Sequence, residues 1–198
     1  AAIEDNHYFT LGRTDVGAGN TLDFDGSNDF IEVSSDPSLS LSDFTLEAWI
    51  KTSQTSTAFR RVITKPVSGG QNYSLAINNG KAHVRFDPGA SAESPLDVID
   101  GVWHHLAGVF DNTANTLSMY VDGILVDQTS ATGNPITGID NLIIGNFSTS
   151  FSEFYEGQMD EVRIWSDVRS EQEIRDNMNR KLDVASEANL VAYYHFND

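Results

Sequence analysis

The sequence predicts an all-β domain, either a sandwich or a barrel, with one short helix near residues 170–180. Apolar and polar residues alternate with a period of two in several short runs, as strands with one buried face require. The dipeptides Asn79-Gly80 and Asp122-Gly123 separate such runs, and both tolerate the positive φ of a two-residue hairpin. Only one segment has a helical period instead. Many short strands with turns between them are typical of a sandwich or a barrel.

Strands are expected along most of the chain after a leading segment. Residues 1–20 show no sustained period, and we expect at most one short strand there. The clearest strand covers residues 44–51, where every second residue is apolar and should face a core. The other set, which includes Trp49, should face away from that core. The same alternation predicts strands over residues 73–77, 82–86, 117–121 and 162–164.

The one predicted helix is indicated by its first turn and by an apolar stripe. Ser170 and Glu173 have the spacing of a capping box, in which each side chain accepts a hydrogen bond from the backbone of the other. Ile174, Met178 and Leu182 follow at intervals of four residues and would line one side of a helix.

We expect residues 1–198 to form a single domain that ends on a strand over 190–198. A strand at a terminus must pair within a sheet, and its abrupt end suggests a domain cut from a longer protein. The expected partners therefore include neighbouring domains of the same chain.

The balance of acidic and basic residues excludes some classes of binding partner. The chain has 12 Lys and Arg against 29 Asp and Glu, which gives a net charge of −17, and its basic residues are scattered. Such a charge repels phosphate backbones, so we expect no nucleic-acid partner. No apolar run approaches the ~18 residues of a membrane span, so we expect no membrane insertion. Because there is no cysteine, disulfides and thiolate nucleophiles are excluded.

Six blocks of sequence occur in a fixed order along the chain. They are LDFDGSNDFIEV from residue 22, FTLEAWI from 44, WHHLA from 103, LSMYVDG from 117, LIIG from 142 and GQMDEVRIW from 157. In this order they resemble the blocks of the concanavalin A-like lectin/glucanase superfamily, in its laminin G-like family. The resemblance runs from about Leu22 to the predicted helix.

The resemblance implies a two-sheet antiparallel jelly-roll sandwich that serves as a module of secreted or cell-surface proteins. It also implies a carbohydrate or protein ligand and, frequently, a bound calcium ion. We therefore expect a non-catalytic, extracellular, lectin-like module that binds a glycan or glycoprotein. The alternatives are an adhesion or spacer module that binds protein and, less favoured, a glycoside hydrolase.

The expected calcium site starts from the densest cluster of oxygen-bearing side chains, residues 23–29. Calcium takes six to eight oxygen ligands, but the same residues also suit an ordinary turn in which Asp and Asn bond nearby backbone amides. The resemblance implies that Asp25 and Asp160 meet at one calcium, and Ser27 and Asn28 are further candidate ligands. The strand parity of Asp160 matches that of Val162, so we expect its carboxylate on the buried face.

Two regions are candidates for ligand contact. The stretch 147–155 carries four aromatic residues without a clear period, and Phe151 and Tyr155 are its candidates. The other candidates are Tyr73, His83 and Arg85, which could share one sheet face. In both regions the alternative is ordinary packing or solvation, and we likewise expect the three tryptophans to pack rather than to bind.

Catalysis is disfavoured by what the motifs lack. Adjacent strand residues point to opposite faces, so His104 and His105 cannot chelate one ion. Glycosidases on such a sandwich carry Glu-x-Asp-x-x-Glu on one strand, which brings the carboxylates to a common face. Here Asp160 and Glu161 are adjacent and followed by the apolar Val162, so their carboxylates should diverge.

Overall fold

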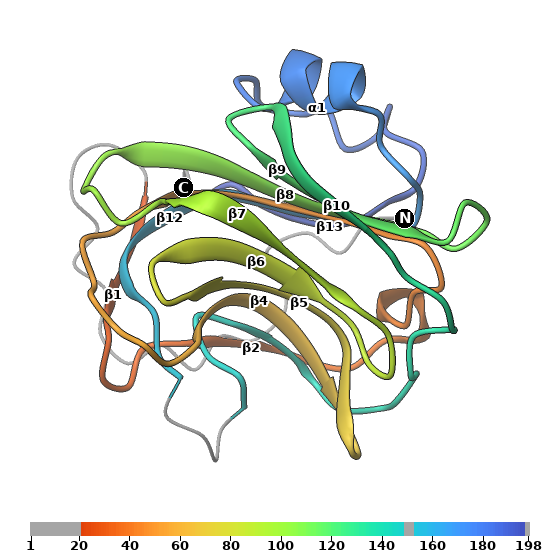
Figure 1. Ribbon diagram of the computed structural model, residues 1–198, viewed down its shortest axis with the longest axis horizontal. Coiled ribbons are helices and arrows are strands. Elements are labelled where there is room, and N and C mark those ends of the chain that lie inside the picture. The colour runs from red at the N-terminus through yellow and green to blue at the C-terminus, as the bar shows by residue number, and fades with distance from the viewer. Residues whose placement is uncertain (1–20, 149–152, 197–198) are drawn as a thin grey trace.

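The computed structural model describes residues 21–148 and 153–196, which form two antiparallel sheets packed face to face and one short helix (Figure 1). The predicted jelly-roll sandwich with a single helix near residues 170–180 is confirmed. The helix α1 spans Glu171–Asn177, and a 3-10 turn, η1, spans Pro37–Leu39. None of the described helices has the length and apolar character that crossing a membrane requires.

Sheet A has seven strands, in the order β1-β12-β3-β8-β9-β10, with β13 also beside β12. Their bounds are β1 Leu22–Asp25, β3 Phe44–Lys51, β8 Trp103–Asp111, β9 Thr116–Val121, β10 Ile124–Ser130, β12 Glu156–Trp165 and β13 Leu190–Tyr194. Sheet B has six strands, in the order β2-β11-β4-β5-β6-β7. Their bounds are β2 Ile31–Val33, β4 Arg60–Val67, β5 Gly70–Asn78, β6 Lys81–Arg85, β7 Ser91–Asp97 and β11 Leu142–Ile144.

The core lies between the two sheets and is filled by alternate residues of their inner faces. In β3 the predicted apolar set is fully buried. Phe44 from this set contacts the rings of Tyr73 and Phe110, with centroids 5.6 and 5.7 Å away. The turns at Asn79-Gly80 and Asp122-Gly123 have positive φ at both residues and close the β5–β6 and β9–β10 hairpins, as predicted.

Strand β12 holds the first and last strands of the described chain on one of its two edges. One edge pairs with β3, and the other pairs with β1 over residues 156–159 and with β13 over residues 162–165. Both β1 and β13 are antiparallel to β12, so they lie end to end in the same direction. The break between them lies opposite residues 160 and 161.

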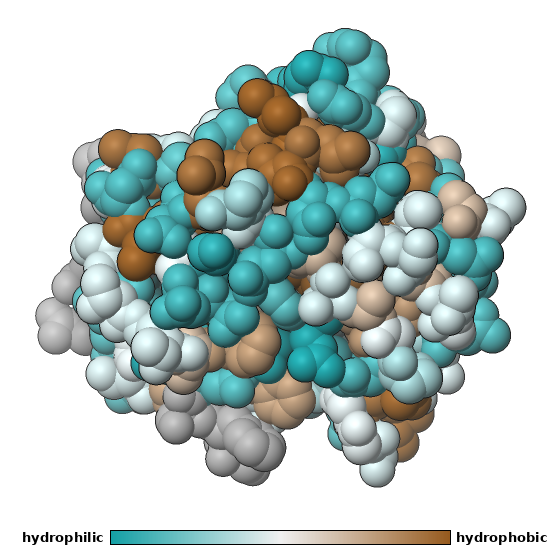
Figure 2. Space-filling model, in the orientation of Figure 1, coloured by the Kyte–Doolittle hydropathy of each residue, from teal (hydrophilic) through white to brown (hydrophobic). Residues whose placement is uncertain are grey.

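The segment after β12 covers the outer face of sheet A. It includes α1, whose predicted capping box between Ser170 and Glu173 is present. Ile174 of α1 packs on outward side chains of β8 and β9. Figure 1 shows α1 on the side of sheet A away from sheet B. In Figure 2 apolar surface gathers close to α1, near the β9–β10 hairpin, and β10 carries the exposed side chains Ile124 and Leu125.

Candidate functional site

A groove of about 540 Å³ opens on the outer face of sheet A. Strands β3, β8 and β12 form its floor, and the loop after α1 forms one wall. The lining residues are Thr21, Trp49, Trp103, Asp160, Glu161, Met178, Asn179, Arg180 and Lys181. The period of β3 sends Trp49 outward, as predicted, and the pairing of Lys51 with Trp103 brings the β8 indole to the same end of the sheet.

A β-bulge in β12 turns Asp160 into this groove. Asp160 pairs with Trp49, whereas Arg163 pairs with Glu47, so two residues of β12 lie opposite one residue of β3. Glu161 is the residue with positive φ, +52°. Because one extra residue reverses the parity, Asp160 and Arg163 both face outward. The prediction that Asp160 lies on the buried face is therefore wrong.

The carboxylate of Asp160 is half-buried and has few interaction partners in the protein. Its Oδ1 accepts a hydrogen bond from the backbone amide of Glu161, at 2.8 Å. Burial, together with the neighbouring negative charge of Glu161, raises the pKa of Asp160 to about 6 against the lowering effects of that amide and of the Arg163 charge. Among the residues that the structure describes, no cation forms an ion pair with Asp160.

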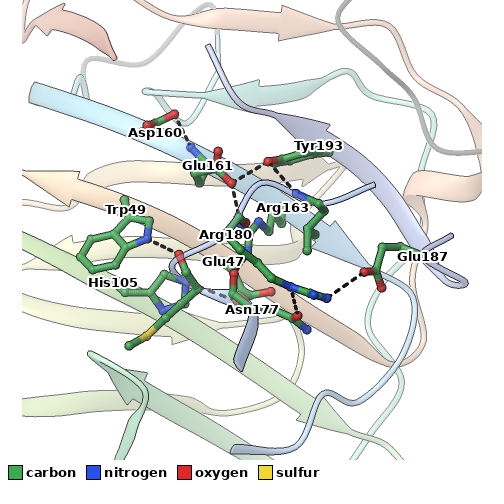
Figure 3. Close-up of polar contacts among 12 residues, drawn as sticks. Glu47, Trp49, His105, Asp160, Glu161, Arg163, Asn177, Arg180, Glu187 and Tyr193 are labelled. Atoms are coloured by element: carbon green, nitrogen blue, oxygen red, sulfur yellow. Dashed lines mark hydrogen bonds and ion pairs between the residues drawn. The ribbon is translucent and has the colours of Figure 1, made fainter. Parts of the chain in front are cut away.

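Glu161, Arg163 and Tyr193 form a buried clamp that holds the bulge and the loop wall together (Figure 3). The Glu161 carboxylate accepts hydrogen bonds from the Arg163 guanidinium and from the Tyr193 hydroxyl, the latter at 2.6 Å. Arg163, which is fully buried, also donates to the backbone carbonyls of Asn177 (2.9 Å) and Arg180 (2.7 Å). The clamp therefore uses the Glu161 carboxylate for structure.

The indole of Trp49 is fixed in place. Its Nε1 donates to the carbonyl of Met178 at 2.6 Å, and its ring packs on that of His105, with centroids 5.4 Å apart. His105 is buried with Glu47, and Nε2 and Oε2 are 3.3 Å apart. Trp165, which is buried as predicted, donates to the other oxygen of Glu47 at 2.6 Å. The aromatic floor of the groove thus rests on a packed polar layer.

The predicted calcium turn forms, and one carboxylate oxygen of Asp25 is used by its own backbone. Oδ1 of Asp25 accepts from the amides of Ser27 (2.8 Å) and Asn28 (3.1 Å). These two hydrogen bonds lower the pKa of Asp25, because they favour the charged form. The geometry is that of the turn alternative, in which an Asp side chain caps nearby amides.

The structure does not bring Asp25 and Asp160 together. Asp25 pairs with Glu156, four residues from Asp160 along β12, which is about 13 Å at the usual strand rise. In the described part of the chain, no group of three or more His, Cys, Asp or Glu side chains could hold a metal ion. The described residues therefore do not form the shared site that the resemblance implied, and calcium itself stays a prediction.

Two of the predicted ligand residues are in the core. Tyr73 has no exposed surface and packs on Phe44. Tyr155 is also fully buried: it packs edge-on against Phe24 at 5.8 Å and donates its hydroxyl hydrogen to the carbonyl of Gln158 at 3.0 Å. The predictions for Tyr73 and Tyr155 are wrong, because both rings fill space between the sheets. Phe151 lies outside the described residues.

His83 and Arg85 do lie on one face, the outer face of sheet B. His83 is only 5% exposed, however, and Phe59 packs edge-on against its ring at 5.1 Å. Burial lowers the pKa of His83 to about 4. Arg85 forms an ion pair with Asp87 at 2.6 Å. This face therefore satisfies its charges internally and offers less to a ligand than the groove does.

The sequence carried a signal for the groove that the expected packing of all three tryptophans overlooked. Trp49 stands in the polar set of β3, so its period alone places a large aromatic side chain on an outer face. Trp103 and Asp160 carried no such signal, because their position depends on the register and on the bulge.

Comparisons with known proteins agree on the fold. A family model described as the concanavalin A-like lectin/glucanases superfamily matches residues 25–175. The "Sushi, von Willebrand factor type A, EGF and pentraxin domain-containing protein 1" of Rattus norvegicus is 24% identical over 193 residues, which are 92% of this chain and 5% of the rat protein. The chain thus spans a small part of that relative.

Two solved structures share the architecture. A Bacteroides ovatus protein described as a candidate carbohydrate binding protein superposes with a TM-score of 0.72 at 23% identity, covering 89% of this chain and 51% of that chain. Domain 4 of AbnA, an extracellular arabinanase from Geobacillus stearothermophilus solved with arabinotriose, has a TM-score of 0.63 at 18% identity. It covers 87% of this chain and 82% of that chain.

Proposed function

Because the chain belongs to the concanavalin A-like lectin/glucanases superfamily, we propose that it is a carbohydrate-binding domain and that the groove on sheet A is its glycan site. One observation carries the proposal: Trp49, Trp103 and the under-supported carboxylate of Asp160 line one cavity. The Bacteroides structure, described as that of a candidate carbohydrate binding protein, and the Geobacillus domain, solved with arabinotriose, support the same class of ligand.

The chemistry of the lining suits a sugar. An aromatic ring can cover the apolar C–H face of a sugar ring, and a carboxylate accepts hydrogen bonds from its hydroxyl groups. The volume of about 540 Å³ lies within the range of small-molecule sites in proteins. Because the groove is open to solvent, we expect dissociation constants on the order of micromolar to millimolar.

We propose binding without hydrolysis. Glycosidases need two carboxyl groups on either side of the scissile bond, one acid and one base or nucleophile. Of the two carboxylates in the groove, Glu161 is held by Arg163 and Tyr193. Among the described residues only Asp160 is left for a ligand, so this part of the chain supplies the groove with no second partner for acid–base chemistry.

The proposal extends to an extracellular module within a longer protein. Support comes from the extracellular arabinanase that contains the Geobacillus domain and from the small share of the rat relative that the chain spans. Calcium is given no role in the groove, because Asp25, the other expected ligand, pairs with Glu156, about 13 Å from Asp160 along β12.

Affinity electrophoresis against arabinan, galactan, laminarin and mannan tests the proposal, with intrinsic fluorescence as a second readout. At least one polymer should retard the protein and change the emission of the two groove tryptophans. Trp103→Ala should weaken that retention at least about tenfold, or ~1.4 kcal/mol. Val102→Ala is the matched control, because this neighbouring side chain is 53% exposed and outside the groove lining.

The possible outcomes separate the candidate functions. If a polymer retards Trp103→Ala as strongly as the unaltered protein, the glycan binds outside the groove. Binding to a protein partner with no retention on any polymer would favour the adhesion alternative. Release of reducing ends from a retarding polymer would show hydrolysis and overturn the non-catalytic proposal.

A further inference from the structure

Four ionisable side chains of the described residues line the groove, and two of them already have partners. Glu161 accepts from Arg163 and Tyr193 in the clamp. Arg180 donates Nε to the side chain of Asn177 at 2.8 Å, and its Nη2 lies 3.4 Å from a carboxylate oxygen of Glu187 (Figure 3). A ligand would have to break the clamp contacts to use the charge of Glu161, whereas the Arg180 side chain is 60% exposed and its charge is partly offset by Glu187.

Asp160 and Lys181 are the other two ionisable groups. Within residues 21–148 and 153–196, neither takes part in an ion pair. Their surroundings differ, because Asp160 is half-buried on the floor and Lys181 is exposed on the rim. Water and salt screen an exposed charge far more strongly than a half-buried one, so the negative charge of Asp160 dominates inside the groove.

A half-buried carboxylate discriminates between classes of sugar. It accepts hydrogen bonds and donates none, so the hydroxyl groups of an uncharged glycan match it. A uronate or sulfate group would instead place a second negative charge beside it in a poorly solvated groove, which is unfavourable. The net charge of −17 adds repulsion of any polyanion over a range of roughly 8 Å at physiological salt.

We propose that the groove takes uncharged glycans and rejects polyanionic ones, and that Asp160 sets this selectivity. The inference rests on the proposed function, since it assigns a ligand class to the same site. Asp160 is able to act in this way because the bulge at Glu161 turns it outward, and because the clamp commits the neighbouring guanidinium of Arg163 to Glu161.

The test uses pairs of polymers that share a backbone and differ in charge. Galactan, laminarin and mannan are each compared as the native polymer and after oxidation of the primary hydroxyl groups to carboxylates. For every native polymer that binds, the oxidised form should bind at least about tenfold more weakly in 0.15 M salt. Asp160→Asn should reduce this ratio to within about threefold.

Two variants serve as controls. Asp97→Asn makes the same change in net charge at an exposed carboxylate of β7, in the other sheet, and should leave the ratio unchanged. Lys181→Gln should also leave it tenfold or more. Equal or tighter binding of an oxidised polymer by the unaltered protein would overturn the inference, as would a tenfold ratio that survives in Asp160→Asn. In both cases the proposed function stands. Failure of every polymer to bind would instead overturn the proposed function and the inference with it.

Discussion

The turn at Asp25 and the bulge at Asp160 shift the pKa of the same type of side chain in opposite directions. Asp25 is exposed, accepts two backbone amides from its own turn, and has a lowered pKa. Asp160 is half-buried, accepts one amide, and has a pKa raised to about 6. Both belong to the strands that form one edge of sheet A.

The difference teaches that local backbone geometry decides whether a carboxylate is available. A turn bends its own amides toward the side chain and satisfies it, whereas a bulge aims the side chain away from its neighbours. In the turn the carboxylate stabilises the fold, and in the bulge it carries a cost that the clamp around Glu161 offsets. A carboxylate that lies in a cavity and has few hydrogen-bond partners is a better indication of a binding site than a cluster of acidic residues in the sequence.

Of the changes considered, removal of the clamp that holds the bulge should have the largest effect on the free energy of unfolding. Arg163→Ala leaves the Glu161 carboxylate without its cation and two carbonyls of the loop wall without their donor. We expect the free energy of unfolding, measured in urea, to fall by about 3–5 kcal/mol. Arg175→Ala is the control, since its ion pair with Glu171 is exposed and should contribute less than about 1 kcal/mol. Equal losses in the two variants would show that the clamp does not hold the bulge.

The two aspartates should respond to pH with opposite signs. The folded pKa of Asp160 exceeds its unfolded value, so its contribution to stability is full at low pH and is lost as the pH rises from about 4 to about 6. A rise of this size corresponds to about 3 kcal/mol, which screening of a half-exposed group reduces to about 1–2 kcal/mol. Asp160→Asn should therefore stabilise the fold by that amount at pH 7.5 and have little effect at pH 4.

Asp25→Asn supplies the comparison in the same urea titrations. Its pKa is lowered in the fold, so its stabilising contribution is present above the unfolded value and is lost as the pH falls. We expect this substitution to destabilise the fold at pH 7.5, the reverse of Asp160→Asn. The same sign for both would refute the contrast between turn and bulge.

The smallest expected effect is the coupling between the two positions. Because Asp25 pairs with Glu156, about 13 Å from Asp160 along β12, Asp25→Ala and Asp160→Ala should be additive within about 0.5 kcal/mol. A double-mutant cycle in EDTA and in millimolar calcium measures this. Coupling above ~1 kcal/mol that appears only with calcium would contradict the separation and restore the shared metal site.

Much of the fold could be predicted from the sequence, because the two signals used depend on burial and on local backbone preference. Period-two alternation fixes which residues of β3 face the core, and it placed Trp49 outward. The hairpin at Asn79-Gly80 and the capping box at Ser170 need only a few neighbouring residues. Each of these elements is confirmed.

The groove could not be predicted in the same way. Counting parity along β12 assumes an unbroken period, and nothing in the residues around Glu161 marks the extra one. The cavity also needs the loop after α1, which hydrogen bonds from Trp49 and Arg163 on distant strands hold in place. For Tyr73 the sequence pattern was right and the prediction of ligand contact was wrong. Tyr73 alternates with Leu75 and Ile77, which indicated the core, and its ring is buried there despite its polar hydroxyl.

The interrupted strand on the edge of β12 has a mechanical consequence. β13 runs toward β1 along this edge, and the gap between them lies opposite the bulge. A tension applied between residues 21 and 195 would act on the sheet at that gap. It would break the hydrogen bonds of β1 and of β13 with β12 one after another, starting from the gap. The first bonds to open would be those beside Asp160, so stretching the domain would deform its groove before its core.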